Sequence, residues 1–226
     1  MKKWIADIKE KTSKMNKKEA GSYIWNYYWY YILGIISIVA LILLFGIHYV
    51  SGGQKPLFTC VMVNQRQDTA RDQKLAETFS KTADISKKKA VIDSEYNFSY
   101  GTVKLEGVNE SSNEKFFFQW RNKELDAVIL SESFLRYCED LGGEFQTIER
   151  KDMGEFSPYE ENGKCIAAVL GYDVLTEKLS GEKNEKLLLA FPKTSSHKKS
   201  GRAFLEFINN VKKEKIKGIT YEEIIS

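Results

Sequence analysis

Residues 31–50 read YILGIISIVALILLFGIHYV and contain no charged side chain. The uncharged window runs further, from Ala20 to Gln54, although 29% of the chain is charged. About 20 helical residues cross a hydrocarbon core of about 30 Å, and backbone hydrogen bonding in lipid requires a helix. A buried helix of a soluble core seldom runs this long without a charge. The stretch therefore predicts a single transmembrane helix, which we place at residues 23–50 together with its aromatic lead-in.

The charges on either side of this helix predict its orientation. Seven lysines precede it, whereas only Lys55 follows it before Arg66. Positive residues stay on the cytoplasmic side, so residues 1–22 are predicted to form a basic cytoplasmic tail. The aromatic run 23–31 fits the belt at the inner interface. The lipid bilayer is thus an expected partner, and the protein is predicted to lie in the cell membrane with its C-terminal domain extracellular.

A cleaved signal peptide and a lipoprotein are the alternatives to an uncleaved anchor. A signal peptide would have a shorter apolar region and a shorter basic lead, and no small-x-small site follows this one. Residues 57–60 (LFTC) resemble a lipoprotein box, but Phe58 and Thr59 are bulky for it, so Cys60 is predicted to be a strand residue. We expect residues 51–56 to be a linker and residues 57–226 to be the outer domain.

The composition of the outer domain limits its partners. Residues 51–226 carry 27 basic and 28 acidic side chains, so the net charge of +3 belongs to the tail. No nucleic-acid partner is therefore expected. Cys60, Cys138 and Cys165 allow one disulfide on an exported side and leave one thiol over; which two would pair, or whether any do, stays open.

Short apolar strands alternate with amphipathic helices along the outer domain. Strands are predicted at 57–63, 89–98, 125–130, 165–170 and 187–191, and helices at 69–82, 114–123, 134–141 and 201–211. Residues 144–163 are predicted to be irregular and to end in a turn at Asn162-Gly163. The cluster at residues 116–118 and Trp120 are predicted to be core. The alternation predicts an α/β domain whose sheet is mostly parallel and flanked by helices.

The order of these elements resembles the type 2 periplasmic, or extracellular, solute-binding fold. In that family an apolar strand like ELDAVIL at residues 124–130 is followed by a capped helix, which SESFLRY at residues 131–137 fits. Residues 187–208 resemble the family's return strand and the helix after it. The resemblance spans about residues 56–211 and implies a periplasmic-binding-protein fold and a small-molecule ligand. Because members are usually longer, the second lobe here would be small.

The aromatic lead-in to the membrane helix carries a second resemblance. Its Tyr-Ile-Trp-x-Tyr-Tyr pattern, at residues 23–28, is similar to that of membrane-anchored proteins of clostridia-like Gram-positive bacteria.

Candidate ligand-binding residues follow the strands of the predicted sheet. In open α/β sheets, ligands lie beyond the carboxyl ends of the strands and near helix N-termini. The residues at these positions are Asn64, Gln65, Tyr96, Asn97, Ser131, Glu132, Ser133 and Tyr172. Three of them also have a structural interpretation: Ser131 as a plain helix cap, and Tyr96 and Tyr172 as partly buried packing residues.

Sequence patterns typical of catalytic sites are scarce in this chain. The two histidines, His48 and His197, have no sequence partner for a triad or a metal cluster, and His197 is expected to be a solvated loop residue. No phosphate-binding glycine loop occurs. We therefore expect no enzyme, metal or cofactor, and predict a solute-binding-like module accessory to a membrane transporter or sensor subunit. The alternative is a structural or protein-interaction domain of a membrane complex, without a ligand.

Overall fold

The computed structural model describes residues 10–52, 56–85, 90–108, 110–181 and 183–225. They belong to two compact units, Met1–Gln54 and Lys55–Ser226, which are described separately. Residues 1–9 of the predicted tail and 53–55 of the predicted linker lie outside the described part of the chain.

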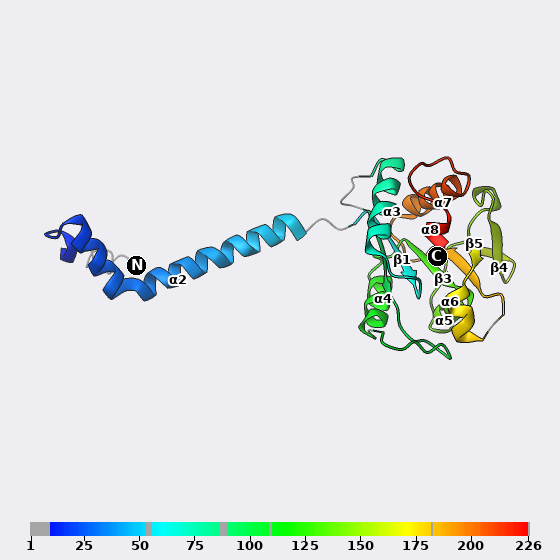
Figure 1. Cartoon of the computed structure of the whole chain (residues 1–226), viewed down its shortest axis with the longest axis horizontal. Helices are drawn as coiled ribbons and strands as arrows, with labels where there is room; N and C mark the ends of the chain where they lie inside the picture. Colours follow the sequence, from blue (N-terminus) through cyan, green and yellow to red (C-terminus); the bar gives the residue numbers. More distant parts are fainter. Residues whose placement is uncertain (1–9, 53–55, 86–89, 109, 182, 226) are drawn as a thin grey trace. The chain divides into compact units, whose positions relative to one another are not determined.

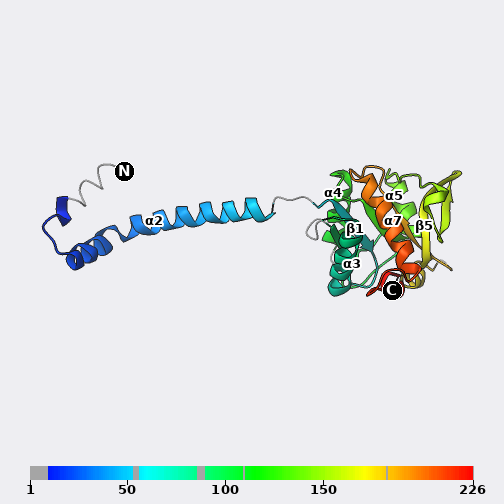
Figure 2. The same cartoon turned by 90° about the horizontal axis from the view of Figure 1, so that it is seen from above.

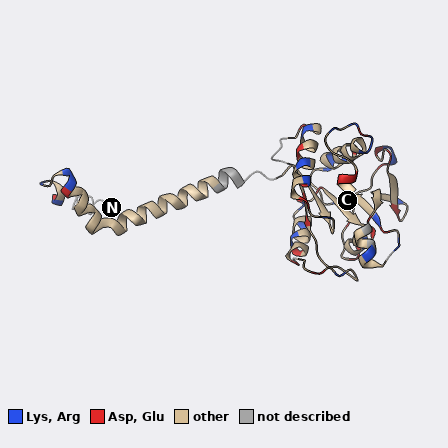
Figure 3. Cartoon of the chain, viewed as in Figure 1, with Lys and Arg blue, Asp and Glu red and all other residues tan. Residues whose placement is uncertain are grey.

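The main element of the first unit is the 36-residue helix α2 (Lys17–Gly52). It begins at a capping box: Asn16 Oδ1 accepts hydrogen bonds from the backbone nitrogens of Lys18 and Glu19 at 3.0 and 2.9 Å, and the Asn16 nitrogen donates to Glu19 Oε2 at 3.2 Å. The helix therefore starts within the predicted tail. Beyond this first turn it carries no charged side chain (Figure 3). It is long and apolar enough to cross a membrane.

The second unit is an α/β domain built on one six-stranded sheet, with the strand order β2-β1-β3-β6-β5-β4 (Figure 1). Its strands are β1 (Phe58–Val63), β2 (Ala90–Tyr96), β3 (Ala127–Ser131), β4 (Ser157–Glu161), β5 (Lys164–Tyr172) and β6 (Lys186–Ala190). Its helices are α3 (Thr69–Thr82), α4 (Ser111–Arg121), α5 (Glu132–Asp140), η2 (Arg150–Asp152), α6 (Val174–Ser180), α7 (Lys198–Lys212) and α8 (Glu222–Ile225).

The sheet is mixed, which corrects the prediction of a mostly parallel sheet. β1 pairs in parallel with β2 and β3, whereas β3–β6, β6–β5 and β5–β4 are antiparallel pairs. The β4–β5 hairpin turns at Asn162 and Gly163, whose φ angles of 49° and 73° suit a two-residue hairpin loop. β4 itself lies in the segment predicted to be irregular, because its sequence SPYEE is that of an exposed edge strand with little apolar signal.

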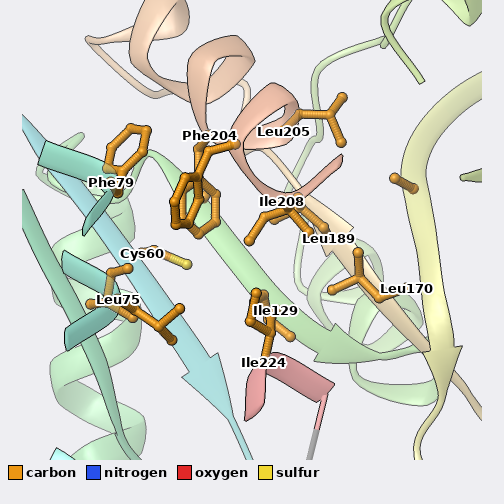
Figure 4. Close-up of a cluster of buried hydrophobic side chains, with 14 of the residues drawn as sticks. Cys60, Leu75, Phe79, Ile129, Leu170, Leu189, Phe204, Leu205, Ile208 and Ile224 are labelled. Atoms are coloured by element: carbon orange, nitrogen blue, oxygen red, sulfur yellow. The ribbon is translucent and has the colours of Figure 1, made fainter. Parts of the chain in front are cut away.

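Helices cover both faces of this sheet, and alternate side chains of β1 point to each face. On one face, α3, α7 and α8 enclose an apolar cluster that includes Cys60, Phe79 and Phe204 (Figure 4). Figure 2 looks onto this face, with α3 and α7 in front. On the other face, α4 and α5 supply Phe116 and Phe134 to a second cluster. The domain is thus a three-layer α/β structure.

Helix α4 corrects one core prediction. Phe116 and Trp120 are buried, as predicted, and Phe117 packs partly against the same cluster. Phe118 is instead 64% exposed. Residues four apart share a helix face, whereas a residue two positions away points about 200° around the axis. The triple-phenylalanine run therefore places one ring in solvent.

The sequence left open whether any two of the three cysteines form a disulfide. Cys60, Cys138 and Cys165 are all buried and all free. Each belongs to an apolar cluster on one face of the sheet or the other.

Candidate functional site

The carboxyl ends of four strands meet at one edge of the sheet. β1, β2 and β3 are parallel, and β6 is antiparallel to both β3 and β5, so β5 runs in the direction of β3. Ser131 and Gly171 both face Leu187 of β6. The candidate residues after β1, β2, β3 and β5 therefore lie along one edge, which we call the carboxyl edge.

Asn64 and Tyr96 form hydrogen bonds that stabilise the carboxyl edge. Asn64 has a φ of 53°, and its side chain brackets Phe98: Nδ2 donates to the Phe98 oxygen at 3.1 Å and Oδ1 accepts from the Phe98 nitrogen at 3.0 Å. The hydroxyl of Tyr96 donates to Gln119 Oε1 at 2.7 Å, and Lys115 Nζ lies 4.5 Å from its ring centre. Both side chains thus connect β1 and β2 to the next loop and to α4.

Ser131 and Ser133 form a hydroxyl cluster with Tyr100. The Tyr100 hydroxyl lies 2.9 Å from Ser131 Oγ and 2.8 Å from Ser133 Oγ, and the two serine oxygens are 3.2 Å apart. Burial raises the pKa of Tyr100 to about 12. Ser131 Oγ also accepts a hydrogen bond from the Phe134 nitrogen at 3.2 Å, which is the predicted helix cap.

A buried carboxylate of the chain itself lies at the N-terminus of α5. Glu185 Oε1 accepts a hydrogen bond of 2.6 Å from the backbone nitrogen of Ser133. Glu185 is buried, and its backbone oxygen accepts from the Asp173 nitrogen at 2.8 Å. Helix N-termini attract anions because their first backbone N–H groups lack intrahelical partners. The position that an anionic ligand would take at α5 is therefore filled by Glu185.

Gln65 pairs with a second buried acid on this edge. Its Nε2 donates to Asp173 Oδ2 at 2.9 Å, and Asp173 Oδ1 accepts from the Thr176 nitrogen at 3.0 Å at the start of α6. Burial raises the pKa of Asp173, although the hydrogen bonds from Thr176 and Gln65 act in the opposite direction. Gln65 therefore links β1 to the β5–α6 junction.

Three candidates remain, Tyr172, Glu132 and Asn97. Tyr172 is 64% exposed, so the interpretation of this tyrosine as a partly buried packing residue was wrong. Glu132 is partly buried beside Tyr159. Burial raises the pKa of Tyr159, and the nearby Glu132 carboxylate raises it further. Asn97 is partly buried, and its Oδ1 is enclosed without a hydrogen-bond partner among the described residues.

Two of the hollows formed by the described residues bear on function. The first, of about 610 Å³, is polar and lined by Gln67, Glu95, Asn97, Glu106, Gly107, Val108, Ser111, Ser112 and Lys115. The second, of about 700 Å³, is a groove between α4 and α5, lined by Asn113, Glu114, Phe117, Phe118, Trp120, Arg121, Tyr137, Cys138, Leu141, Gly142, Gly143 and Thr194. Phe118 and Leu141 are 64% and 58% exposed, so this groove presents apolar surface to solvent.

No family model matches this chain, and no curated protein or solved structure matches it. Among the described residues, no group of three or more His, Cys, Asp or Glu side chains is placed to hold a metal ion.

The opposite edge of the sheet holds a polar cluster that the sequence did not indicate. Asp126 is buried before β3, and its carboxylate accepts from the Thr59 nitrogen at 3.0 Å and from the Ser195 hydroxyl at 2.6 Å. Nδ1 of His197 lies 3.3 Å from Asp126 Oδ1. His197 is therefore a partner of a buried acid and not simply solvated. The serine hydroxyl is directed at the carboxylate, not at the imidazole, so the three side chains lack the arrangement of a hydrolytic triad.

Proposed function

We propose that this protein is a membrane-tethered interaction domain, whose groove between α4 and α5 binds an apolar segment of another membrane-associated protein. The observation that carries the proposal is the pair of exposed apolar side chains, Phe118 and Leu141, at a groove lined by aromatic rings. Exposed apolar patches of this kind favour protein contacts. Glu114 and Arg121 line the same groove, so an apolar centre with a polar rim is present, as in protein interfaces.

The hydrogen bonds at the carboxyl edge favour an interaction domain over a solute-binding domain. Most of the side chains expected to bind a solute are committed to the chain's own hydrogen bonds, and Glu185 occupies the N-terminus of α5. A ligand there would have to replace bonds to buried groups, which is costly when a buried donor or acceptor is left unpaired.

The expected topology gives the domain its setting. We place the N-terminus in the cytoplasm and the domain outside, because lysines precede α2 and are sparse just after it. The partner would then be the exposed part of a transporter or sensor subunit in the same membrane.

Photo-crosslinking in native membranes tests this function. A photoreactive phenylalanine analogue at position 118 of the full chain is expected to give a discrete adduct, identified by mass spectrometry, that Leu141→Asp abolishes. The analogue at position 172 is the control, because Tyr172 is equally exposed but lies on the carboxyl edge. Equal adducts from both positions, or none from position 118, would contradict the proposal; an adduct with a second copy of this chain would replace the partner by self-association.

A second candidate function, solute binding, is favoured by the polar hollow beside β2. It combines the enclosed Asn97 Oδ1, which lacks a hydrogen-bond partner among the described residues, with Lys115 and the first residues of α4. Amino acids, sugars and small carboxylates, each at millimolar concentration, are the probes. A rise in the melting temperature of the full chain that Asn97→Ala removes would support this function, and a flat response to all probes would eliminate it.

A further inference from the structure

The edge of the sheet where β1 begins is rich in lysine. β1, β2 and β3 start at this edge and β6 ends there, so we call it the tether edge. Of the segments that lead into or out of these strands here, the structure describes residues 56–57, 83–85, 122–126 and 191–199, which contain four lysines and three acidic residues. At the carboxyl edge, the described residues of segments 64–68, 97–110 and 173–185 include four basic and six acidic residues. Charge is thus separated along the strands.

At the tether edge, hydrogen bonds to the carboxylate of Asp126 connect a neighbouring loop to the start of β1. The carboxylate binds the backbone of Thr59, the second residue of β1, and also the hydroxyl of Ser195. Ser195 Oγ in turn accepts from the His197 nitrogen at 3.1 Å. The loop that leads into Lys198 and Lys199, the first two residues of α7, is therefore fixed beside the point where the chain enters the domain.

Three lysines of this edge are exposed and uncompensated. Lys123, Lys198 and Lys199 form no ion pair with any residue that the structure describes. The hydroxyl of Ser196 donates to the Lys123 oxygen at 3.4 Å, which brings the two lysine-bearing segments together. Lys193, in contrast, is paired with Glu144.

The tether is short. Five residues, 53–57, separate the end of α2 from the start of β1, and five extended residues span at most about 18 Å. Where α2 crosses a bilayer, a tether of this length allows the start of β1 to come within about 8–10 Å of the headgroup layer, the distance over which exposed charges attract each other at physiological salt.

We propose that the tether edge docks on anionic phospholipid headgroups through Lys123, Lys198 and Lys199. Polybasic segments next to a membrane helix are attracted to anionic lipid in this way. Docking would direct the opposite, carboxyl edge away from the bilayer. The inference holds for either orientation of α2, since it depends only on the tether and on these charges, and it is independent of the groove at Phe118.

Amine labelling of the full chain in nanodiscs tests this docking. Lysine acetylation, read by mass spectrometry, is compared in nanodiscs of pure phosphatidylcholine and in nanodiscs with one third phosphatidylglycerol. The expected result is that labelling of Lys123, Lys198 and Lys199 slows at least about threefold in the anionic discs and recovers in 0.5 M salt. Lys178 and Lys183, exposed on the carboxyl edge, are the internal references and should not change.

Two charge-reversal variants complete the test. Lys198→Glu with Lys199→Glu should abolish the protection of Lys123, whereas Lys178→Glu with Lys183→Glu, an equal change of charge on the other edge, should leave it intact. Protection that is the same in both lipid compositions, or that survives the first variant, would overturn the proposal. Protection that appears only in native membranes would assign the edge to a protein partner instead.

Discussion

The carboxylate of Glu185 accepts a 2.6 Å hydrogen bond from the backbone nitrogen of Ser133, at the first turn of α5. Replacing Glu185 by alanine removes that acceptor and leaves the Ser133 nitrogen without it in a partly buried place. We expect Glu185→Ala to lower the free energy of unfolding by about 1–3 kcal/mol, and Glu185→Gln, which keeps an acceptor, to lower it less. Thermal and urea unfolding of the full chain in detergent would measure both. Glu206→Ala, at an exposed position of α7, is the control; equal losses from both alanine variants would rule out this role.

Gly154 and Gly142 both adopt positive φ, at 60° and 83°, but differ in their surroundings. A Cβ on Gly154 would lie 2.3 Å from Oδ1 of Asn209, which is fixed by hydrogen bonds to the Glu155 nitrogen and the Met153 oxygen. A Cβ on Gly142 would meet nothing within 4 Å. The left-handed conformation costs a non-glycine residue about 1–2 kcal/mol. Gly142→Ala should cost that amount, and Gly154→Ala more, because Asn209 must also move; equal costs in denaturant unfolding would contradict the close approach.

Much of the fold was predictable from local sequence. Asp68 caps α3 through its hydrogen bond to the Arg71 nitrogen, and α3 has its predicted bounds. The predicted strands overlap β1, β3, β5 and β6, which are mostly buried and apolar, and β2, which buries alternate residues. β4 was not predicted, because an exposed edge strand lacks the pattern of apolar residues that identifies a buried strand. The mixed character of the sheet was not predicted, because it depends on which strands pair. These strands are distant in sequence, and hydrophobic periodicity does not reveal their pairing.

The strand ends that carry the candidate residues were predictable, but the hydrogen-bond partners of these residues were not. The strand ends were placed correctly, but three members of the network, Tyr100, Asp173 and Glu185, were not singled out. Tyr100 lies in an irregular loop, and the two acids flank α6, a helix that the sequence analysis did not predict. Which polar side chains fill a strand-end site depends on contacts over many residues, such as the one that joins Gln65 to Asp173. Acidic and hydroxyl residues in loops carry no such signal by themselves.

The three free cysteines should be unreactive while the domain is folded. Burial raises the pKa of Cys60, Cys138 and Cys165, and the thiolate is the reactive species. We expect a thiol reagent such as DTNB to react at least about tenfold more slowly with the native chain than with the denatured chain, where it should count three thiols. A rapid native reaction, or a change of mobility on reduction, would show that a thiol is exposed or a disulfide is present.

Phe204 and Phe118 offer a matched pair of phenylalanine truncations. The Phe204 ring is fully buried, with ring centres 4.9 Å from Phe58 and 5.1 Å from Phe79. Phe204→Ala should therefore lower the free energy of unfolding by about 3–5 kcal/mol. Phe118→Ala should change it by less than about 0.5 kcal/mol, because the ring is exposed. A comparable loss from both, measured by denaturant unfolding, would mean that the Phe118 ring is packed in the native state.

Glu139 of α5 and Glu161 of β4 give the domain a pH-dependent stability. Burial, and then the neighbouring carboxylate of Glu161, raise the pKa of Glu139 from 4.5 to about 7. Between these two values the folded chain binds more protons at this site than the unfolded chain does, so the contribution of this site to stability falls as the pH rises from about 4.5 to 7. Below pH 4.5 both states are protonated, and above pH 7 the loss is complete.

Melting temperatures of the full chain between pH 4.5 and 8 would measure this dependence as a difference between variants. Glu139→Gln removes the titrating group, so the variant should gain melting temperature relative to wild type as the pH rises through this window. Glu161→Gln removes only the like charge and not the burial, so its gain should be smaller. Glu160→Gln, whose exposed carboxylate pairs with Arg150, is the control and should follow the wild-type pH dependence. If the Glu139→Gln and wild-type curves stay parallel across this range, then Glu139 does not carry the proton in the folded domain.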